Sequence, residues 1–345
     1  MKELLAQYHK ERGGSIAETC AGVRELSDMF NGVTLRRPGY LSADRLRRAY
    51  VHYYLPVNAE KIARVLAERD RYAPPGRPLR VLDFGCGPGT AAVAWLLGKR
   101  PTASLTLVDV VDEALDDARW FCRQLGVEAR SGPTIPEGET YDLILAANVY
   151  AETEVSLEKH LAPDGHLVVV EPALKDTTRA LQLWRDQRVR EGWKVAAPCL
   201  GQTTCPMSAR SDLWCHMDIP WPRPAGVAEV DRRLGLDKES LKYSYMVLTK
   251  TGPTLDGQWR LVSNLHAEKG KAWAWCCGKE GPLCRVEVLT RHRGEATQDF
   301  FRARRGDVLD LEAAGEFSRS AGPILKRDRD SNRDREVPPR PPGGE

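Results

Sequence analysis

Short apolar segments alternate with amphipathic segments through the middle of the chain. Four of the apolar segments have the length and residue types of buried strands, at 80–84, 104–110, 141–149 and 166–172. Amphipathic or helix-forming segments follow three of them, at 90–99, 112–126 and 177–192. Strands that alternate with helices predict a parallel, doubly wound α/β sheet.

The segments on either side follow other patterns. Residues 1–75 have helical periodicity: Leu46, Ala49 and Tyr53 share one helix face, Pro56 starts a new turn, and an amphipathic helix follows. After residue 192 the periodicity is lost in a stretch rich in Cys, Pro and Trp that extends to about Pro224. Strand-like segments then return at 241–250, 259–265, 271–277 and 284–292.

These changes of pattern divide the chain into four regions. We expect an N-terminal helical region (1–75) and a Rossmann-like domain (76–191). A third region (192–325) contains a Cys-rich loop, a returning strand and a β-rich part. Residues 326–345 are charged and rich in Pro and Gly, which predicts a disordered tail.

Composition narrows the possible environments of the protein. The 345 residues carry a net charge of +3, so the chain does not require a polyanionic partner, although a local basic face is possible. There is no apolar run long enough to cross a membrane and no signal-peptide pattern at the start. We therefore expect a cytoplasmic protein. In a reducing compartment its nine cysteines are free, buried or metal-bound thiols rather than a disulfide framework.

A glycine loop, VLDFGCGPGT, links the first predicted strand to a helix. It contains Asp83 and three glycines: Gly85, Gly87 and Gly89. Glycines let the backbone approach a ligand closely, and the acidic residue can hold a ligand's ammonium group. No Lys-Ser/Thr pair follows, which argues against a phosphate-binding P-loop. Asp109 ends the next strand, where acidic residues bind ribose hydroxyls. Together these features resemble the cofactor-binding motifs of class I S-adenosylmethionine (SAM)-dependent methyltransferases.

The residues expected to carry catalysis are less well defined. Many nucleic-acid amino-methyltransferases have Asn/Asp-Pro-Pro-aromatic after the fourth strand, whereas this chain has Asn148, Val149 and Tyr150. Asn148 is a candidate lining residue of the cofactor pocket, and no general base can be named. Glu171 and Pro172 end the following strand, at the edge where open α/β sheets bind ligands.

Three cysteines lie close together in the aperiodic stretch. Cys199, Cys205 and Cys215 have longer spacings than the close pairs of zinc sites, and Pro206 follows one of them, as is common in iron–sulfur proteins. A fourth thiolate is available from Cys276, Cys277 or Cys284. Buried free thiols are the alternative interpretation. Four further residues are assigned other roles: Cys20 and Cys122 in the core, Cys86 as a small loop residue, and His216 as a hydrogen-bonding neighbour of the metal.

The combination of these segments resembles one family. In order, AYVHYYLPVNAEKIARVL, the glycine loop, PCLGQTTCPMSARSDLWCH, LKYSYMVLTK and CCGKEGPLCRVEVLTRHR are similar to the methyltransferase-like family of the mitochondrial small ribosomal subunit (the methyltransferase-like protein 17 family) and its bacterial relatives. The resemblance covers roughly residues 35–315. It implies a ribosome assembly factor that binds rRNA and carries a [4Fe–4S] cluster. By the match Cys199, Cys205 and Cys215 are ligands and Cys277 is the fourth, with Cys276 the alternative and Cys284 the weakest candidate.

Three functions are consistent with these features. The first is a SAM-dependent methyltransferase acting on rRNA of the small ribosomal subunit. The second is a non-catalytic assembly factor that binds SAM and rRNA. The third is a small-molecule methyltransferase with a zinc-stabilised lid. A bacterial relative would be cytoplasmic and a eukaryotic one would be in the mitochondrial matrix.

Two arginine clusters are candidate phosphate contacts. The first is Arg45, Arg47 and Arg48, and the second is Arg302, Arg304 and Arg305.

Overall fold

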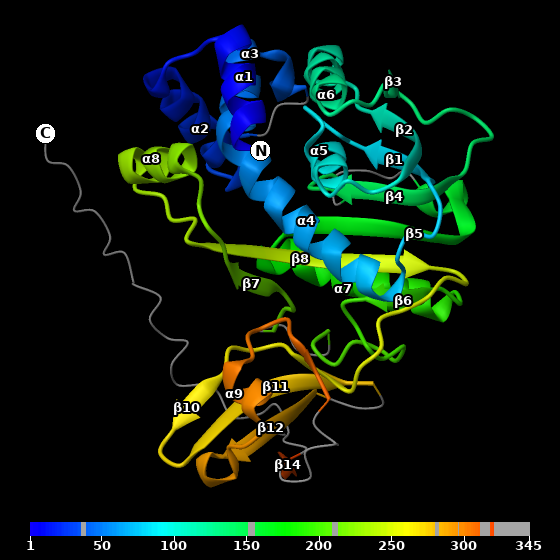
Figure 1. The fold of residues 1–345 in the computed structure, drawn as a ribbon, viewed down its shortest axis with the longest axis vertical. Helices are drawn as coiled ribbons and strands as arrows, with labels where there is room; N and C mark the ends of the chain where they lie inside the picture. The colour runs from blue at the N-terminus through cyan, green and yellow to red at the C-terminus, as the bar shows by residue number, and fades with distance from the viewer. Residues whose placement is uncertain are drawn as a thin grey trace, which may run out of the picture.

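The chain forms a helical layer and two β-sheets (Figure 1). The structure, a computed structural model, describes residues 1–35, 39–150, 156–208, 213–279, 283–295, 297–310 and 318–320. The expected tail at 326–345 and the Glu280–Gly281 turn of the family motif lie outside the described residues. None of the described helices combines the length and apolarity needed to span a lipid bilayer.

The first sheet has the order β3-β2-β1-β4-β5-β8-β6, and β7 pairs with β8. The strands from β1 to β5 are parallel, whereas β8 is antiparallel to β5, β6 and β7. The strands are β1 (Leu79–Phe84), β2 (Thr102–Val108), β3 (Arg130–Gly132), β4 (Tyr141–Ala147), β5 (Leu161–Pro172), β6 (Lys194–Ala197), β7 (Met217–Pro220) and β8 (Ser240–Thr249). The doubly wound α/β sheet predicted from the sequence is confirmed.

Helices cover both faces of this sheet, because successive strand residues alternate between two apolar cores. Val81 belongs to the core shared with α4, α5 and α6, whereas Leu82 belongs to the core shared with α7. Figure 1 shows α4 and α5 on the near face and α7 on the far one. The helices are α4 (Leu55–Tyr72), α5 (Thr90–Leu97), α6 (Asp112–Gln124) and α7 (Lys175–Arg190), with a 3-10 turn at Leu157–His160.

The N-terminal helices form a separate layer with its own apolar core, which also includes α8. Ser15 begins α2 with a capping box, because its side chain accepts the N–H of Glu18 and the Glu18 carboxylate accepts the N–H of Ser15. The helices are α1 (Lys2–Arg12), α2 (Ile16–Phe30), α3 (Asp44–Ala49) and α8 (Ala225–Leu234), with a 3-10 turn at Tyr40–Ser42.

The second sheet lies below the first in Figure 1 and has the order β13-β9-β11-β12-β14, with β10 beside β11. All of its pairings are antiparallel. Its elements are β9 (Trp259–Leu261), β10 (His266–Glu268), β11 (Lys271–Gly278), β12 (Leu283–Leu289), the 3-10 turn Thr290–His292, α9 (Gln298–Arg302), β13 (Val308–Leu309) and β14 (Ser318–Ser320).

Three elements differ from the sequence expectations. Pro56 does not start a separate turn: a π-helical turn at Tyr50–Tyr54 continues directly into α4, and proline is tolerated there because it lies in the first turn. Strands β6 and β7 lie inside the stretch expected to be aperiodic. Each has four residues, too few to show a period, and each is stabilised by pairing with β8.

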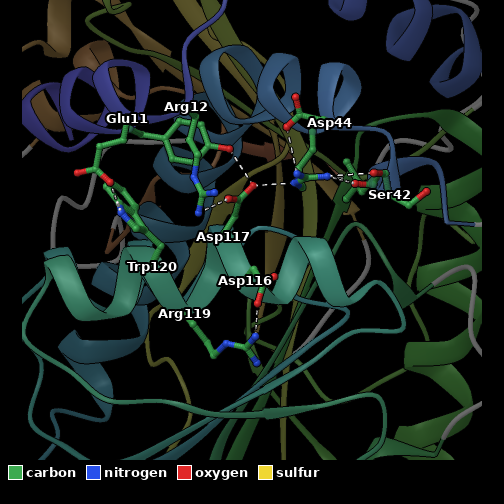
Figure 2. A network of polar contacts seen from close by, with 11 residues as sticks. Glu11, Arg12, Ser42, Asp44, Asp116, Asp117, Arg119 and Trp120 are labelled. Carbon is green, nitrogen blue, oxygen red and sulfur yellow. Dashed lines mark hydrogen bonds and ion pairs between the residues drawn. The ribbon is translucent and has the colours of Figure 1, made fainter.

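A buried ionic network joins the helical layer to the sheet (Figure 2). The Asp117 carboxylate on α6 accepts hydrogen bonds from Tyr8 Oη (2.8 Å) and Arg47 Nε (2.8 Å). Arg47 also donates to the carbonyl oxygens of Leu41 (3.0 Å) and Ser42 (3.1 Å). Because Asp117 and Arg47 are both buried, neither charge has water as an alternative partner.

We expect Asp117→Ala to destabilise the protein by about 3–5 kcal/mol, because the buried Arg47 guanidinium would lose its buried counter-ion and keep only the exposed Asp44 carboxylate. Urea unfolding followed by circular dichroism measures this loss. Asp116→Ala is the matched control, since the neighbouring Asp116 is exposed and its ion pair with Arg119 lies at the surface. Equal losses for the two variants would contradict the importance of the network.

Candidate functional site

The glycine loop between β1 and α5 has a backbone that only glycine adopts easily. Gly85, Gly87 and Gly89 have φ angles of +62°, +50° and +83°. A Cβ atom at Gly85 would lie 2.4 Å from a methyl carbon of Val149, so the loop passes very close to the segment after β4. A Cβ atom at Gly87 would lie 3.3 Å from Leu41, which places the N-terminal layer against the same loop.

Two carboxylates flank this loop. Asp109, directly after β2, accepts hydrogen bonds from the backbone N–H groups of Gly87 (2.7 Å) and Val111 (3.0 Å). Asp83, near the end of β1, accepts the N–H of Ala92 in α5 (2.8 Å). The carboxyl ends of neighbouring parallel strands therefore bring these sequence-predicted residues together, as expected for an open α/β sheet.

The electrostatics of the loop favour a cationic ligand. Burial and, to a smaller extent, the nearby Asp109 charge together raise the pKa of Asp83 to about 7. A positive charge placed beside these carboxylates would stabilise their ionised forms. SAM carries both an ammonium and a sulfonium group, so the residues present fit this cofactor.

The raised pKa of Asp83 predicts a pH-dependent stability. The unfolded carboxyl has a pKa near 3.8, so between about pH 4 and pH 7 the folded state binds more protons and stability falls as pH rises. Asp83→Asn removes this ionisation, so in the absence of ligand the variant should gain stability over the wild type toward pH 8, by about 1.4 kcal/mol per unit of pKa shift. Urea unfolding at pH 5 and pH 8 measures the gain. Asp112→Asn, an exposed control, should show no such pH-dependent difference.

The described part of the segment after β4, residues 148–150, approaches the loop and contains no general base. Asn148 has a φ angle of +58°, an uncommon conformation, and its backbone N–H donates to the Val170 carbonyl (2.8 Å). Glu171 is buried at the end of β5 and accepts the N–H of Tyr150 (2.8 Å). Glu171 therefore holds the segment after β4 in place at the carboxyl edge of the sheet.

A second site lies between the two sheets. One cavity is lined by Cys199, which follows β6, by Cys205 in the next loop, by Cys215 before β7 and by Cys277 on β11. The thiol of Cys277 is close enough to the other three for each to influence its pKa electrostatically. The structure thus gathers residues that are up to 78 positions apart in sequence, from Cys199 to Cys277.

Strand geometry separates the three candidates for the fourth thiol. Successive residues of β11 point to opposite faces, so Cys276 and Cys277 cannot share an environment. Cys276 and Cys284 are opposite each other in the β11–β12 pair and pack together in the core of the second sheet. Neither of them lines the cavity, whereas Cys277 does.

The cavity has a size and chemistry that suit a multi-atom metal centre. Its interior has room for water-sized spheres over a volume of about 60 Å³. Within the described parts of the chain, no group of three or more His, Cys, Asp or Glu side chains is arranged to hold a metal ion. A tetrahedral zinc site draws its sulfurs to about 2.3 Å from the ion. The four thiols that line the cavity are the donor type that iron–sulfur clusters use.

The thiols would not be ionised without a metal. Burial raises the pKa of Cys205 to about 11 and that of Cys215 to about 12, and the neighbouring thiols add to both shifts. Burial also raises the pKa of Cys277. Metal ligation requires the thiolate form, so any binding at this cavity would be coupled to proton release.

Helix α7 supports the cysteine loop through residues that the sequence analysis missed. Arg185 donates to the carbonyl oxygens of Gly201 (2.8 Å) and Thr203. Asp186 accepts the backbone N–H of Cys205 (2.9 Å). In the sequence these two residues are only an Arg-Asp pair on a predicted helix. Such a pair cannot be distinguished from charged residues on an ordinary solvent-exposed helix face.

His216 is placed beside the cavity rather than in its lining. Its ring stacks on Trp214, with centroids 5.8 Å apart, and contacts the Arg305 guanidinium. Cys122 is fully buried in the core and Cys86 is buried in the glycine loop, whereas Cys20 is partly buried against the N-terminal core.

The two arginine clusters differ in how they are paired. In the first, Arg45 pairs with Glu25, Arg47 with Asp117 and Arg48 with Asp44, so these side chains are already engaged within the protein. In the second, Arg302 and Arg304 are exposed and form no ion pair with any described residue. The second cluster is therefore the better candidate for contacts with phosphate.

The strand order, the antiparallel β8 and the glycine loop after β1 define the class I SAM-dependent methyltransferase fold. The model of one protein family, described as mitochondrial small ribosomal subunit Rsm22, matches residues 45–310. The chain belongs to this family, and the resemblance predicted from the sequence is confirmed. No curated protein sequence gives a significant match.

Solved structures similar to this chain include methyltransferases. A ribosomal protein L11 methylase from Lactobacillus delbrueckii subsp. bulgaricus has 16% identity, with 56% of this chain and 78% of that chain covered, and a TM-score of 0.34. A SAM-dependent methyltransferase from Thiobacillus denitrificans, in complex with S-adenosyl-L-homocysteine, has 16% identity, coverage of 55% and 91%, and a TM-score of 0.35. At these TM-scores the fold assignment depends on the strand order and not on the similarities.

Proposed function

We propose that this protein acts on the small ribosomal subunit as a SAM-binding, rRNA-associated methyltransferase-like factor that carries a [4Fe–4S] cluster. Asp83, Gly85, Gly87, Gly89, Asp109 and Asn148 would hold SAM. Cys199, Cys205, Cys215 and Cys277 would ligate the cluster. The observation that carries the proposal is the convergence of these four cysteines on one cavity in a chain whose family is named for the small ribosomal subunit.

Whether the protein transfers a methyl group depends on the segment after β4. The Val149 side chain lies against Gly85, and the backbone N–H of Asn148 is engaged with Val170. Apart from Asp83 and Asp109, which are assigned to SAM binding, and Glu171, which holds Tyr150, the described residues offer no base beside the glycine loop. These observations favour the second candidate function, a non-catalytic assembly factor in which SAM and the cluster stabilise the rRNA-binding form.

A small-molecule methyltransferase with a zinc-stabilised lid has less support. The cysteines surround a cavity instead of closing around one ion, and the family name refers to a ribosomal subunit. Under the proposed function the protein would be located with its ribosome, in the bacterial cytoplasm or the mitochondrial matrix.

Anaerobic purification of the full chain tests the proposal on one sample. Iron and sulfide analysis, the visible spectrum and SAM calorimetry are measured together with rRNA methylation and co-sedimentation with small ribosomal subunits. Four iron and four sulfide per chain, with SAM binding and co-sedimentation, are expected for a four-iron cluster. Methyl transfer to rRNA would select the enzyme, and its absence the assembly factor. Colourless protein with one zinc and no sulfide would overturn the iron–sulfur assignment.

If Arg302 and Arg304 contact phosphate, rRNA affinity should depend on salt through them. The double variant Arg302→Ala, Arg304→Ala should make the plot of log affinity against log salt concentration less steep, by about 1–2 in slope. The reason is that each phosphate contact contributes about 0.7–0.9 to that slope. Filter binding between low and physiological salt measures the slope. Arg45→Ala is the control, since Arg45 pairs with Glu25. An unchanged slope in the double variant would remove these two residues from the interface.

A further inference from the structure

Two buried arginines share the cavity with the four cysteines. Arg185 on α7 is 2% exposed and Arg260 on β9 is 4% exposed, and both line the cavity. Buried arginines are rare unless their charge is compensated. These two therefore need partners that account for every one of their donors.

Each arginine lies beside a different part of the cysteine set. Arg260 is directly opposite Cys277 in the antiparallel β9–β11 pair, so the two side chains share one face of the sheet. Arg260 also interacts electrostatically with Cys215. Arg185 interacts in the same way with Cys199 and Cys205. All four cysteines thus have a guanidinium in their immediate surroundings.

The terminal nitrogens of both guanidinium groups are engaged. Arg185 donates to Asp186 (2.6 Å) and to two carbonyl oxygens of the cysteine loop. Arg260 donates to Glu68 (2.9 Å), the Pro198 carbonyl (3.1 Å) and Tyr245 Oη (2.9 Å). These contacts hold the two side chains in fixed positions at the wall of the cavity.

The remaining donor of each arginine has no protein acceptor. Nε of Arg185 and Nε of Arg260 are buried and lack a hydrogen-bond partner among the described residues. A buried N–H without an acceptor is unfavourable, so an acceptor bound in the cavity that both arginines line would stabilise them. Sulfur atoms of thiolates and sulfides accept such bonds, and a cluster held by four thiolates carries net negative charge that a buried site must offset.

We propose that Arg185 and Arg260 are positioning residues for a four-thiolate metal centre, to whose sulfur atoms they donate Nε–H hydrogen bonds. This inference rests on the proposed function, because it requires the centre. It adds that the centre must present sulfur acceptors to two buried Nε–H donors, because the charges of these arginines are already matched by Asp186 and Glu68.

The two roles of each arginine can be separated by substitution. Arg260→Lys and Arg185→Lys keep the positive charge but remove the Nε donor, whereas Arg260→Gln and Arg185→Gln remove the charge as well. Arg188→Gln is the matched control, because Arg188 lies one turn further along α7, pairs with Glu158 and Glu191, and does not line the cavity.

The full-length variants are purified anaerobically, and iron, sulfide and the reduction midpoint potential are measured by dithionite titration with EPR detection. In each glutamine variant the reduction equilibrium constant should fall at least tenfold, which corresponds to a potential about 59 mV lower for a one-electron couple. The lysine variants should show a smaller shift in the same direction, and Arg188→Gln none.

The outcomes separate this inference from the proposed function. Wild-type protein without iron and sulfide would overturn both. Variants that load as the wild type does and keep its potential would overturn the inference alone. If the glutamine variants do not fold, the lysine variants decide: a lower potential at wild-type loading supports the hydrogen bonds, and an unchanged potential overturns them.

Discussion

Cys277→Ser is expected to abolish the metal centre, whereas Cys276→Ser, one residue earlier, is expected to leave it intact. The reason is the alternation of β11: Cys277 lines the cavity with three other thiols, and Cys276 faces the core of the second sheet. Loss of one thiolate from a four-cysteine site removes a ligand that serine replaces poorly, because iron–sulfur clusters are held by thiolates. Iron and sulfide content and the visible absorbance of anaerobic protein measure the effect.

The matched pair makes this prediction sharp. Cys276→Ser places a hydroxyl in an apolar core, so it should lower stability without lowering iron content. Cys199→Ser, Cys205→Ser and Cys215→Ser should behave like Cys277→Ser. They should also destabilise the second sheet more than the first, because the centre ties the loop after β6 to β11. A brown Cys277→Ser protein, or a colourless Cys284→Ser protein, would show that the fourth ligand is misassigned.

The second large effect is expected at the glycine loop. Gly87→Arg should eliminate measurable SAM binding in calorimetry, because Gly87 has a φ angle of +50° and is buried between Asp109 and Leu41. A long side chain there would displace the loop from its hydrogen bond to Asp109. The proposed SAM site would then lose its ribose-binding carboxylate and its close backbone approach together.

A second variant and a control exclude trivial unfolding. Asp109→Ala keeps the glycines but removes the carboxylate, so affinity should fall by about 1–3 kcal/mol rather than vanish. Gly132→Ala is the control, because Gly132 ends the neighbouring strand β3 and a Cβ there would meet nothing within 4 Å. Wild-type SAM affinity in folded Gly87→Arg protein would contradict the assignment of this loop as the cofactor site.

The sequence determined the sheet and the location of the first site because both depend on local patterns. Buried parallel strands appear as short apolar runs, and a loop with three glycines at positive φ appears as spaced glycines. Asp109 could be placed beside that loop because parallel strands end at one edge of the sheet. The short strands β6 and β7 could not be predicted, since their stability comes from pairing with β8.

Only the tertiary structure brought the second site together. Sequence spacing left Cys276, Cys277 and Cys284 open as the fourth thiol, and the choice depends on which face of β11 meets the loop after β6. The roles of Arg185 and Arg260 were not visible either, because a charged residue on a helix or strand has the same sequence signal whether it is solvated or buried against a distant partner. Long-range packing decides which of these charges is removed from water, and for this protein it placed two of them beside four thiols.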